Sequence, residues 1–187
     1  GRLYAALGCV EDESLPEALA RHWQGAFRSW EAAAAPAWWS ARPSAVSARR
    51  AREATGGCAC GACAFAAAIF PGEVQHCYCR LCRRLSGAAA MSWVPASKER
   101  FRWTASDGLQ LVRTTGHGQR HMCATCGGVL TIVYDSQPDC IWPVAGALDD
   151  ESVEDGEWYR VVHICCSMMQ PWYRLPDDDL PRLRGPG

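Results

Sequence analysis

Short apolar runs separated by turn residues dominate the chain after Gly56. Seven of them lie at 62–69, 74–77, 88–94, 110–113, 128–134, 140–144 and 161–165. Turn pairs such as Pro71-Gly72, Asp107-Gly108 and Gly127-Gly128 separate the runs. Runs of this length, bounded by glycine and proline, favour antiparallel strands over helices. The pattern therefore predicts a mainly β body.

One long segment near the start of the chain shows helical spacing instead. Residues 14–17 have the spacing of a capping box with Pro16 in the first turn, and an apolar series continues to Trp30. This pattern predicts an amphipathic helix over about residues 15–35, which ends near Pro36.

Composition divides the chain into two parts. Residues 1–52 contain four of the nine tryptophans and one of the 12 cysteines, and the stretch 41–52 carries four arginines and no acidic residue. Such a charge run is typical of a solvated linker. We therefore expect an N-terminal α-helical extension with an arginine-rich linker at 1–52, followed by a β domain at 53–187. The tryptophans of the extension either pack on the β domain or contact a protein partner.

The overall charge and hydrophobicity exclude two classes of partner. The formal net charge is −1, so there is no electrostatic reason to expect binding to nucleic acid or to an anionic membrane. The apolar runs are much shorter than the roughly 18 residues that a membrane-spanning helix needs. We expect neither a nucleic-acid partner nor a membrane span.

The cysteines supply the candidate chemistry. Seven of them form close groups: Cys58 and Cys60; Cys77, Cys79 and Cys82; and Cys123 and Cys126. These spacings bring thiolates within reach of one ion, whereas such close neighbours pair poorly as disulfides. Structural zinc takes four protein ligands, and a substrate-binding zinc site keeps three with one position open. Seven cysteines therefore predict two zinc sites. A single helical turn at 80–86 would let Cys79 and Cys82 face the same way.

Free thiols in such number also predict a compartment. Cysteines that remain reduced for metal binding are typical of reducing environments. We expect the cytoplasm or an organelle interior, such as the mitochondrial matrix or the plastid stroma.

Five motifs resemble those of a known family. They are GGCACG at 56–61, CYCRLCRRLSG at 77–87, MCATCGG at 122–128, PDCIWPVAGALDD at 138–150 and PWYRLPDDDLPRL at 171–183. In this order they are similar to the motifs of the glutathione-dependent formaldehyde-activating enzymes, a family that includes centromere protein V. The resemblance covers about residues 55–184 and omits the extension.

The resemblance implies a fold and an allocation of ligands. The implied fold is Mss4-like, a β-tent of small antiparallel sheets around zinc. The implied structural zinc is held by Cys58, Cys60, Cys123 and Cys126. The implied second zinc is held by Cys77, Cys79 and Cys82 at the glutathione site.

The resemblance also implies a reaction. Glutathione would add to formaldehyde to give S-hydroxymethylglutathione, and the reverse step makes the enzyme a carbon–sulfur lyase. Arg83 and Ser86, which follow the second group of cysteines, are the candidate catalytic residues, and Arg84 is a further candidate for holding a substrate carboxylate. The alternative is a non-catalytic, zinc-stabilised accessory subunit of a larger assembly, for which an organelle is one setting, because a fold does not fix a function.

The fourth position of the second site is left open by the sequence. His76 and Cys140 are candidate fourth ligands, although His76 is expected to point across the strand from Cys77. Further thiols outside the motifs are Cys63, Cys165 and Cys166. Tyr78 stands where the family usually has a small polar residue or histidine. These departures bear on the substrate pocket more than on the fold.

Overall fold

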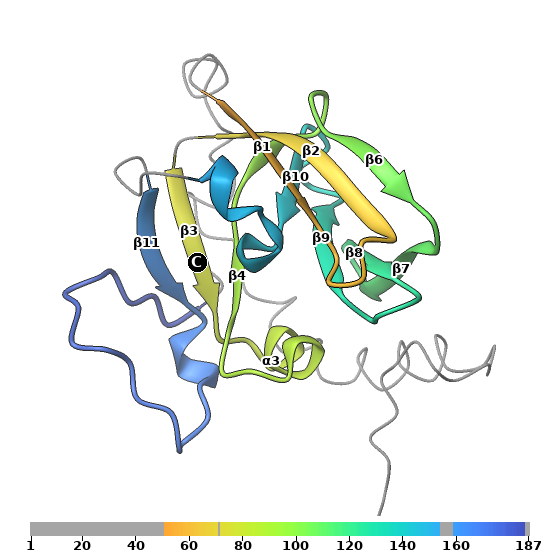
Figure 1. Cartoon of the computed structure of the whole chain (residues 1–187). Coiled ribbons are helices and arrows are strands. Elements are labelled where there is room, and N and C mark those ends of the chain that lie inside the picture. Colours follow the sequence, from red (N-terminus) through yellow and green to blue (C-terminus); the bar gives the residue numbers. More distant parts are fainter. Residues whose placement is uncertain (1–50, 71, 154–158, 186–187) are drawn as a thin grey trace, which may run out of the picture.

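A computed structural model describes residues 51–70, 72–153 and 159–185. Over these residues the chain forms eleven strands, one short α-helix and several 3-10 turns. Figure 1 shows how these elements are arranged. The mainly β class expected from the sequence is confirmed. The helix expected at 15–35 and the tryptophans of the extension lie outside the described residues. Within the described part of the chain, no helix is long and apolar enough to cross a membrane.

A large sheet makes up most of the domain. Its path runs through β1 (Arg52–Gly57), β2 (Cys63–Ile69), β5 (Ala96–Ser97), β10 (Cys140–Pro143), β9 (Val129–Tyr134), β8 (Gly118–Cys123) and β7 (Leu109–Thr115). Strand β6 (Arg102–Ser106) lies off this path and pairs with β2. All of these pairs are antiparallel.

A second, three-stranded sheet lies beside the first. Its order is β11 (Tyr159–Ile164), β3 (Gly72–Cys77) and β4 (Met91–Trp93). Strands β3 and β4 are antiparallel, but β11 and β3 are parallel and place Ile164 opposite Cys77. The sequence pattern did not predict this parallel pair, since a parallel pair needs a long connection. Here residues 78–158 provide it.

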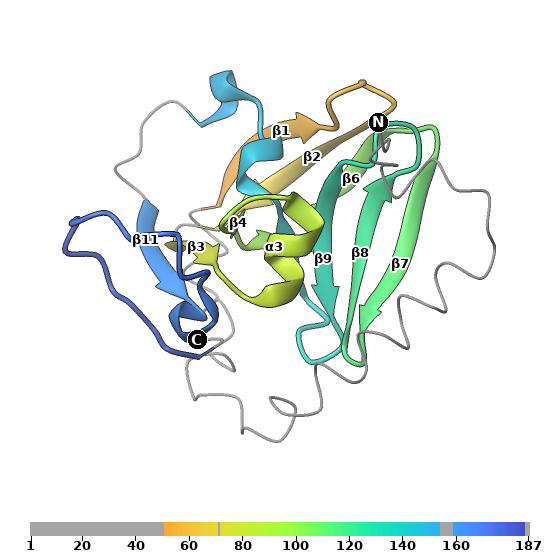
Figure 2. The ribbon, with the colours of Figure 1, turned by 90° about the horizontal axis from the view of Figure 1, so that it is seen from below.

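The single described α-helix is α3 (Arg80–Ser86), and its bounds are those expected from the sequence. Cys79 is its N-cap residue and accepts a hydrogen bond from the amide of Cys82, while Gly87, with φ of 66°, ends it in the left-handed conformation. Seen from below, α3 lies between the small sheet and strands β7–β9 (Figure 2).

Four strands lie outside the predicted runs, namely β1, β5, β6 and β8. Strand β5 has two residues, and β6 alternates exposed and half-buried positions with a charged residue at its start. Strand β8 is GQRHMC, with Arg120 buried. An apolar run is a weak guide to such strands, because their pairing and not their composition sets them.

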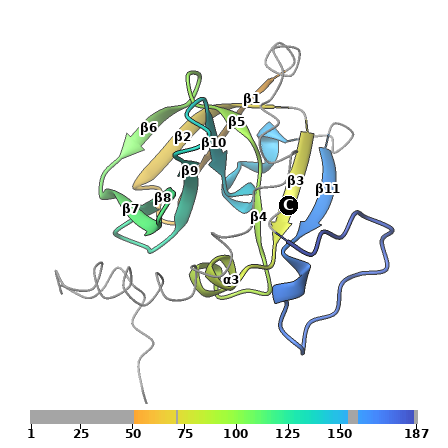
Figure 3. The same ribbon diagram turned by 180° about the vertical axis from the view of Figure 1, so that it is seen from behind.

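Two apolar clusters form the core. The first lies on the large sheet around Phe65, against which the rings of Phe101 and Trp103 pack at centroid distances of 5.2 and 5.9 Å. The second joins the small sheet to β9 and includes Trp93, Val162 and two of the cysteines from the second group. The view from behind shows β3, β4 and β11 together on one side of the large sheet (Figure 3).

Candidate metal centres

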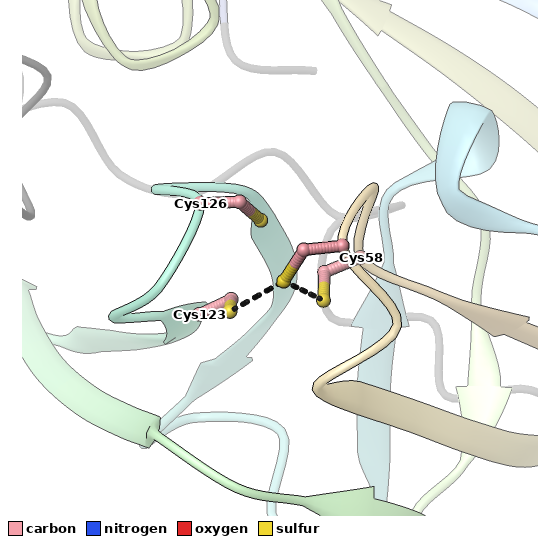
Figure 4. Close-up of side chains that lie close together, drawn as sticks. Cys58, Cys123 and Cys126 are labelled. Atoms are coloured by element: carbon pink, nitrogen blue, oxygen red, sulfur yellow. Dashed lines mark hydrogen bonds between the residues drawn. The ribbon is translucent and has the colours of Figure 1, made fainter.

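The first candidate centre is built from two hairpin loops of the large sheet. Cys58 and Cys60 lie in the loop between β1 and β2, while Cys123 ends β8 and Cys126 lies in the turn before β9. Figure 4 shows the thiols of Cys58, Cys123 and Cys126 pointing toward one another from the two loops. The structure therefore brings together four cysteines that are up to 68 residues apart in the sequence (126 − 58).

The sulfur positions fit a tetrahedral metal. All four sulfurs lie within 4.8 Å of one another, with Cys58 to Cys60 at 3.5 Å and Cys60 to Cys123 at 3.7 Å. Four thiolates at about 2.3 Å from zinc are separated from one another by about 3.8 Å. The four cysteines thus have the chemistry and the spacing of a closed zinc site.

Backbone amides favour the ionised thiols at this centre. Burial raises the pKa of Cys123, but hydrogen bonds from the amides of Cys126 and Thr125 and from neighbouring thiols bring it down to about 6. The amide of Cys63 donates to the sulfur of Cys58 at 3.2 Å. The metal-free loops therefore already stabilise a thiolate, which is the form that binds metal.

Negative charge is not shared equally within this centre. The amide of Ala62 lowers the pKa of Cys60, but the thiol of Cys58, burial and the other two thiols raise it to about 12. Without a cation, a second thiolate beside Cys123 is repelled by the first. A divalent ion would remove this penalty.

The second candidate centre lies where β3 meets α3. Cys77 is the last residue of β3, Cys79 caps α3, and Cys82 lies in its first turn. Their sulfurs lie within 4.8 Å of one another. The amide of Cys82 donates to the sulfur of Cys79 at 3.3 Å. Cys79 thus belongs both to the C-x-C pattern that begins at the end of β3 and to the C-x-x-C pattern that begins α3. This overlap explains how a short segment supplies three candidate ligands.

Ionisation at the second centre is concentrated on one thiol. Hydrogen bonds from the thiols of Cys165, Cys77 and Cys82 hold the pKa of Cys79 well below its usual value. The pKa values of Cys77 and Cys82 are raised well above normal by the neighbouring thiols and by burial. Cys77 and Cys82 are buried, whereas Cys79 is half-buried. Cys79 is therefore both the preferred thiolate and the most accessible of the three.

Neither of the two residues considered for the fourth position, His76 and Cys140, joins this group of described cysteines. His76 Nδ1 is paired with the Ser92 hydroxyl at 2.6 Å, and Cys140 is buried in β10 with its sulfur toward a backbone carbonyl. The sulfur of Cys165 lies 3.9 Å from that of Cys77 instead. No spacing in the sequence points to Cys165, because β11 pairs with β3 from the far end of the domain.

The two candidate catalytic residues have local partners. Arg83 Nε donates to the carbonyl of Tyr78 at 3.0 Å, inside the cysteine loop. The Ser86 hydroxyl is exposed, with the carbonyls of Arg83 and Ala90 at 3.4 Å, and it accepts from the amide of Ala88 at 3.2 Å. Arg83 thus stabilises the loop at Tyr78, between Cys77 and Cys79, and Ser86 stabilises the end of α3. Their part in catalysis stays a prediction.

A buried polar chain holds the same loop from its other side. Tyr78 and His163 are each 2% exposed, and the Tyr78 hydroxyl lies 2.8 Å from His163 Nδ1. His163 Nε2 lies 3.1 Å from the Asp178 carboxylate. One tautomer satisfies both bonds: the hydroxyl donates to Nδ1, and Nε2–H donates to the carboxylate. Tyr78, which departs from the family pattern, is therefore an anchor between the cysteine loop and residues 163 and 178.

Comparison with known proteins identifies a family and a similar solved structure. A family model described as "Glutathione-dependent formaldehyde-activating enzyme" matches residues 53–167, which include both cysteine groups and Cys165. A crystal structure of a Rhodobacter sphaeroides protein is similar, with 22% sequence identity and a TM-score of 0.45. That similarity covers 54% of this chain and 95% of the other. No match was found among curated proteins.

Proposed function

Because the matched residues make up more than half of the chain, the protein belongs to the glutathione-dependent formaldehyde-activating enzyme family, and we propose that it joins glutathione to formaldehyde at the second cysteine centre. The product would be S-hydroxymethylglutathione. The reverse reaction breaks a carbon–sulfur bond, so the proposed class is a carbon–sulfur lyase. The first centre, with four cysteines, is proposed to hold a structural zinc only.

The observation that carries the proposal is the three-thiol group at the end of β3, set within a chain of this family. A zinc ion held by these thiols would lower the pKa of an additional bound thiol, so that a thiolate is available at neutral pH. Cys79 is half-buried while Cys77 and Cys82 are buried, so an entering thiol would approach on the Cys79 side.

Arg83 is proposed to position the site. Its guanidinium already donates to the carbonyl of Tyr78, between two of the ligands, and its remaining N–H groups can donate to a carboxylate of the tripeptide. Ser86 is exposed at the end of the same helix and is proposed to contact the substrate from there. Replacing Arg83 by Ala is expected to raise KM for glutathione, and Arg83→Lys is expected to recover only part of the loss, since lysine lacks the planar fork.

The direct test is adduct formation by the zinc-loaded full chain. With glutathione and formaldehyde, the wild type should form the adduct faster than the spontaneous reaction, and Cys79→Ala should lose the acceleration by about 100-fold or more. Cys166→Ala is the matched control, because Cys166 is also half-buried and lies outside both groups. A wild-type rate equal to the spontaneous rate, or a Cys79→Ala variant as active as the wild type, would remove catalysis from this centre.

One observation favours the second candidate function, a non-catalytic zinc-stabilised subunit of a larger assembly. The sulfur of Cys165 lies close to the second centre, and a fourth sulfur there would leave the metal no free position. In that case the residues 1–52 are the proposed contact with a protein partner. A metal-loaded chain that is inactive with every small thiol, and that co-purifies stoichiometrically with one protein only when residues 1–52 are present, would support this candidate.

A further inference from the structure

Cys165 is a fourth thiol at a centre for which the family pattern supplies three. Its sulfur lies 3.9 Å from that of Cys77. Neighbouring sulfurs of a tetrahedral zinc–thiolate site are about 3.8 Å apart. The side chain is 2% exposed, so the thiol faces the other cysteines and not the solvent.

The backbone at Cys165 is held in an unusual conformation. Its φ and ψ are 58° and 34°, in the left-handed region that non-glycine residues rarely adopt. Such strain persists only where the surroundings enforce it, and it is found preferentially at functional sites. This conformation follows the end of β11 at Ile164 and lets the side chain of Cys165 turn toward Cys77.

Two sets of hydrogen bonds enforce this position. On one side, β11 pairs in parallel with β3, so that Ile164 lies opposite Cys77 and its carbonyl accepts from the amide of Tyr78 at 3.0 Å. On the other side, residues 181–185 form a C-terminal strap. The amide of Cys165 donates to the carbonyl of Gly185 at 2.6 Å, and the amide of Cys166 donates to that of Leu183 at 3.0 Å.

From this geometry we propose that Cys165 is the fourth sulfur ligand of the second metal centre in the resting protein. The thiol has the right element, lies 3.9 Å from the sulfur of Cys77 and is almost unexposed to water. Among the described cysteines at this centre only Cys77, Cys79 and Cys82 have sulfurs that all lie within 4.8 Å of one another, so the Cys165 sulfur would move toward them when a metal binds. The strained backbone is explained, because it is the conformation that directs the sulfur into the group. Cys166, the adjacent cysteine, follows the turn and takes no part.

If the proposed function holds, a substrate thiol has to take the place of Cys165. The incoming thiol gives up its proton and binds as the thiolate, and the released Cys165 thiolate accepts a proton, so that atoms and charge balance. Cys165 would thus set how tightly a substrate thiol must bind before it enters the centre. This consequence rests on the proposed function, whereas the ligand assignment does not.

The test is cadmium-113 NMR of the full chain loaded with cadmium at both centres. Each centre gives its own resonance, whose chemical shift moves upfield when a sulfur ligand is replaced by oxygen or nitrogen. Cys165→Gly should move one resonance upfield and leave the other in place. Glycine suits the left-handed backbone, and the unchanged resonance of the first centre reports that the fold is intact. Cys166→Ser should leave both resonances in place.

The outcomes separate the ligand assignment from the activity. Two unmoved resonances in Cys165→Gly would overturn the assignment, as would a Cys77–Cys165 disulfide in the loaded wild type, found by mass spectrometry. Glutathione should displace Cys165, so it should shift the second resonance at a lower concentration in Cys165→Gly than in the wild type. A chain that shows the cadmium shift but forms no adduct keeps Cys165 as a ligand and loses only the proposed function.

Discussion

At the scale of single residues, the two cysteine centres differ in which thiol carries the charge. In the first it is Cys123, whose loop amides outweigh burial, and in the second it is Cys79, surrounded by three other thiols. Amides that point at sulfur are a property of the turn, so they are present before a metal arrives. The metal-free protein should therefore already hold these two thiolates.

Protonation of the Cys123 thiolate should make the metal-free protein less stable as pH falls. Its folded pKa of about 6 lies below the ordinary value of 9.0, so its stabilising contribution is complete above about pH 9 and is lost as pH falls to about 6. Urea unfolding across this range should show a shallower pH dependence for Cys123→Ser than for the wild type. Cys140→Ser is the control, because burial raises the pKa of Cys140 to about 12 and keeps it neutral throughout. Equal slopes for wild type and Cys123→Ser would contradict this role of Cys123.

The carboxylate of Asp178 should stabilise the fold through His163. Asp178→Ala removes the acceptor for the buried His163 Nε2 and for the amide of Leu180, at 3.1 Å each, and should cost about 1–3 kcal/mol of unfolding free energy. Asp177→Ala, one residue earlier and exposed, should change it by less than about 0.5 kcal/mol. Chemical denaturation of the metal-loaded chains measures both values. A similar loss in the two variants would mean that the buried chain adds no stability.

At the scale of elements, one glycine fixes how the first strand meets the 3-10 turns that follow β10. A Cβ at Gly56 in β1 would lie 2.2 Å from the carbonyl oxygen of Ala147 and 2.7 Å from the ring of Phe65. Gly56→Ala should therefore push β1 away from this turn and cost about 1–3 kcal/mol. Gly146→Ala, where nothing lies within 4 Å of the new methyl group, should be close to neutral. The thermal unfolding midpoints of the two variants, each with metal bound, measure this difference. Equal midpoints would show that β1 can move away from the turn without loss of stability.

Elements were predicted best where the sequence pattern is local. The apolar runs located seven strands, and the cysteine spacing located α3, because both depend on residues that are close neighbours in the chain. Strands β5 and β6 were missed, since their place is set by pairing with β2 and β10. The same limit applies to the centres. The grouping of three thiols within six residues can be predicted from their spacing in the sequence. Cys165, in contrast, comes close to them only through the parallel pairing of β11 with β3.

At the scale of the whole molecule, the first centre ties together two hairpin loops that are distant along the large sheet. Strands β1 and β2 lie at one end of the sheet path and β8 near the other, yet their loops meet at the four cysteines. Even the backbone is close there: a Cβ at Gly128 would lie 3.6 Å from that of Cys58. A metal bound at this point would join loops from both halves of the sheet path and so contribute to the folding of the whole sheet.

Removing metal should therefore loosen the entire domain and not one loop. A strong chelator should lower the thermal midpoint of the wild type by on the order of 10 °C or more. Cys126→Ser should start from a lower midpoint and respond less to the chelator, while Cys140→Ser, altered outside both groups, should respond like the wild type. Calorimetry with and without chelator measures these shifts. An unchanged wild-type midpoint would mean that the sulfurs meet without holding an ion of any structural importance.

The order of the small sheet also has a consequence for synthesis on the ribosome. Strand β3 leaves the exit tunnel long before its parallel neighbour β11, so the nascent chain can pair β3 with β4 but must leave one edge of β3 open. An open strand edge invites pairing with other chains, and a late parallel partner prolongs that exposure. Ribosome-bound chains that end before residue 159 should thus be the aggregation-prone stage. Strand β11, the last of the described strands, both covers that edge and brings Cys165 to the second centre.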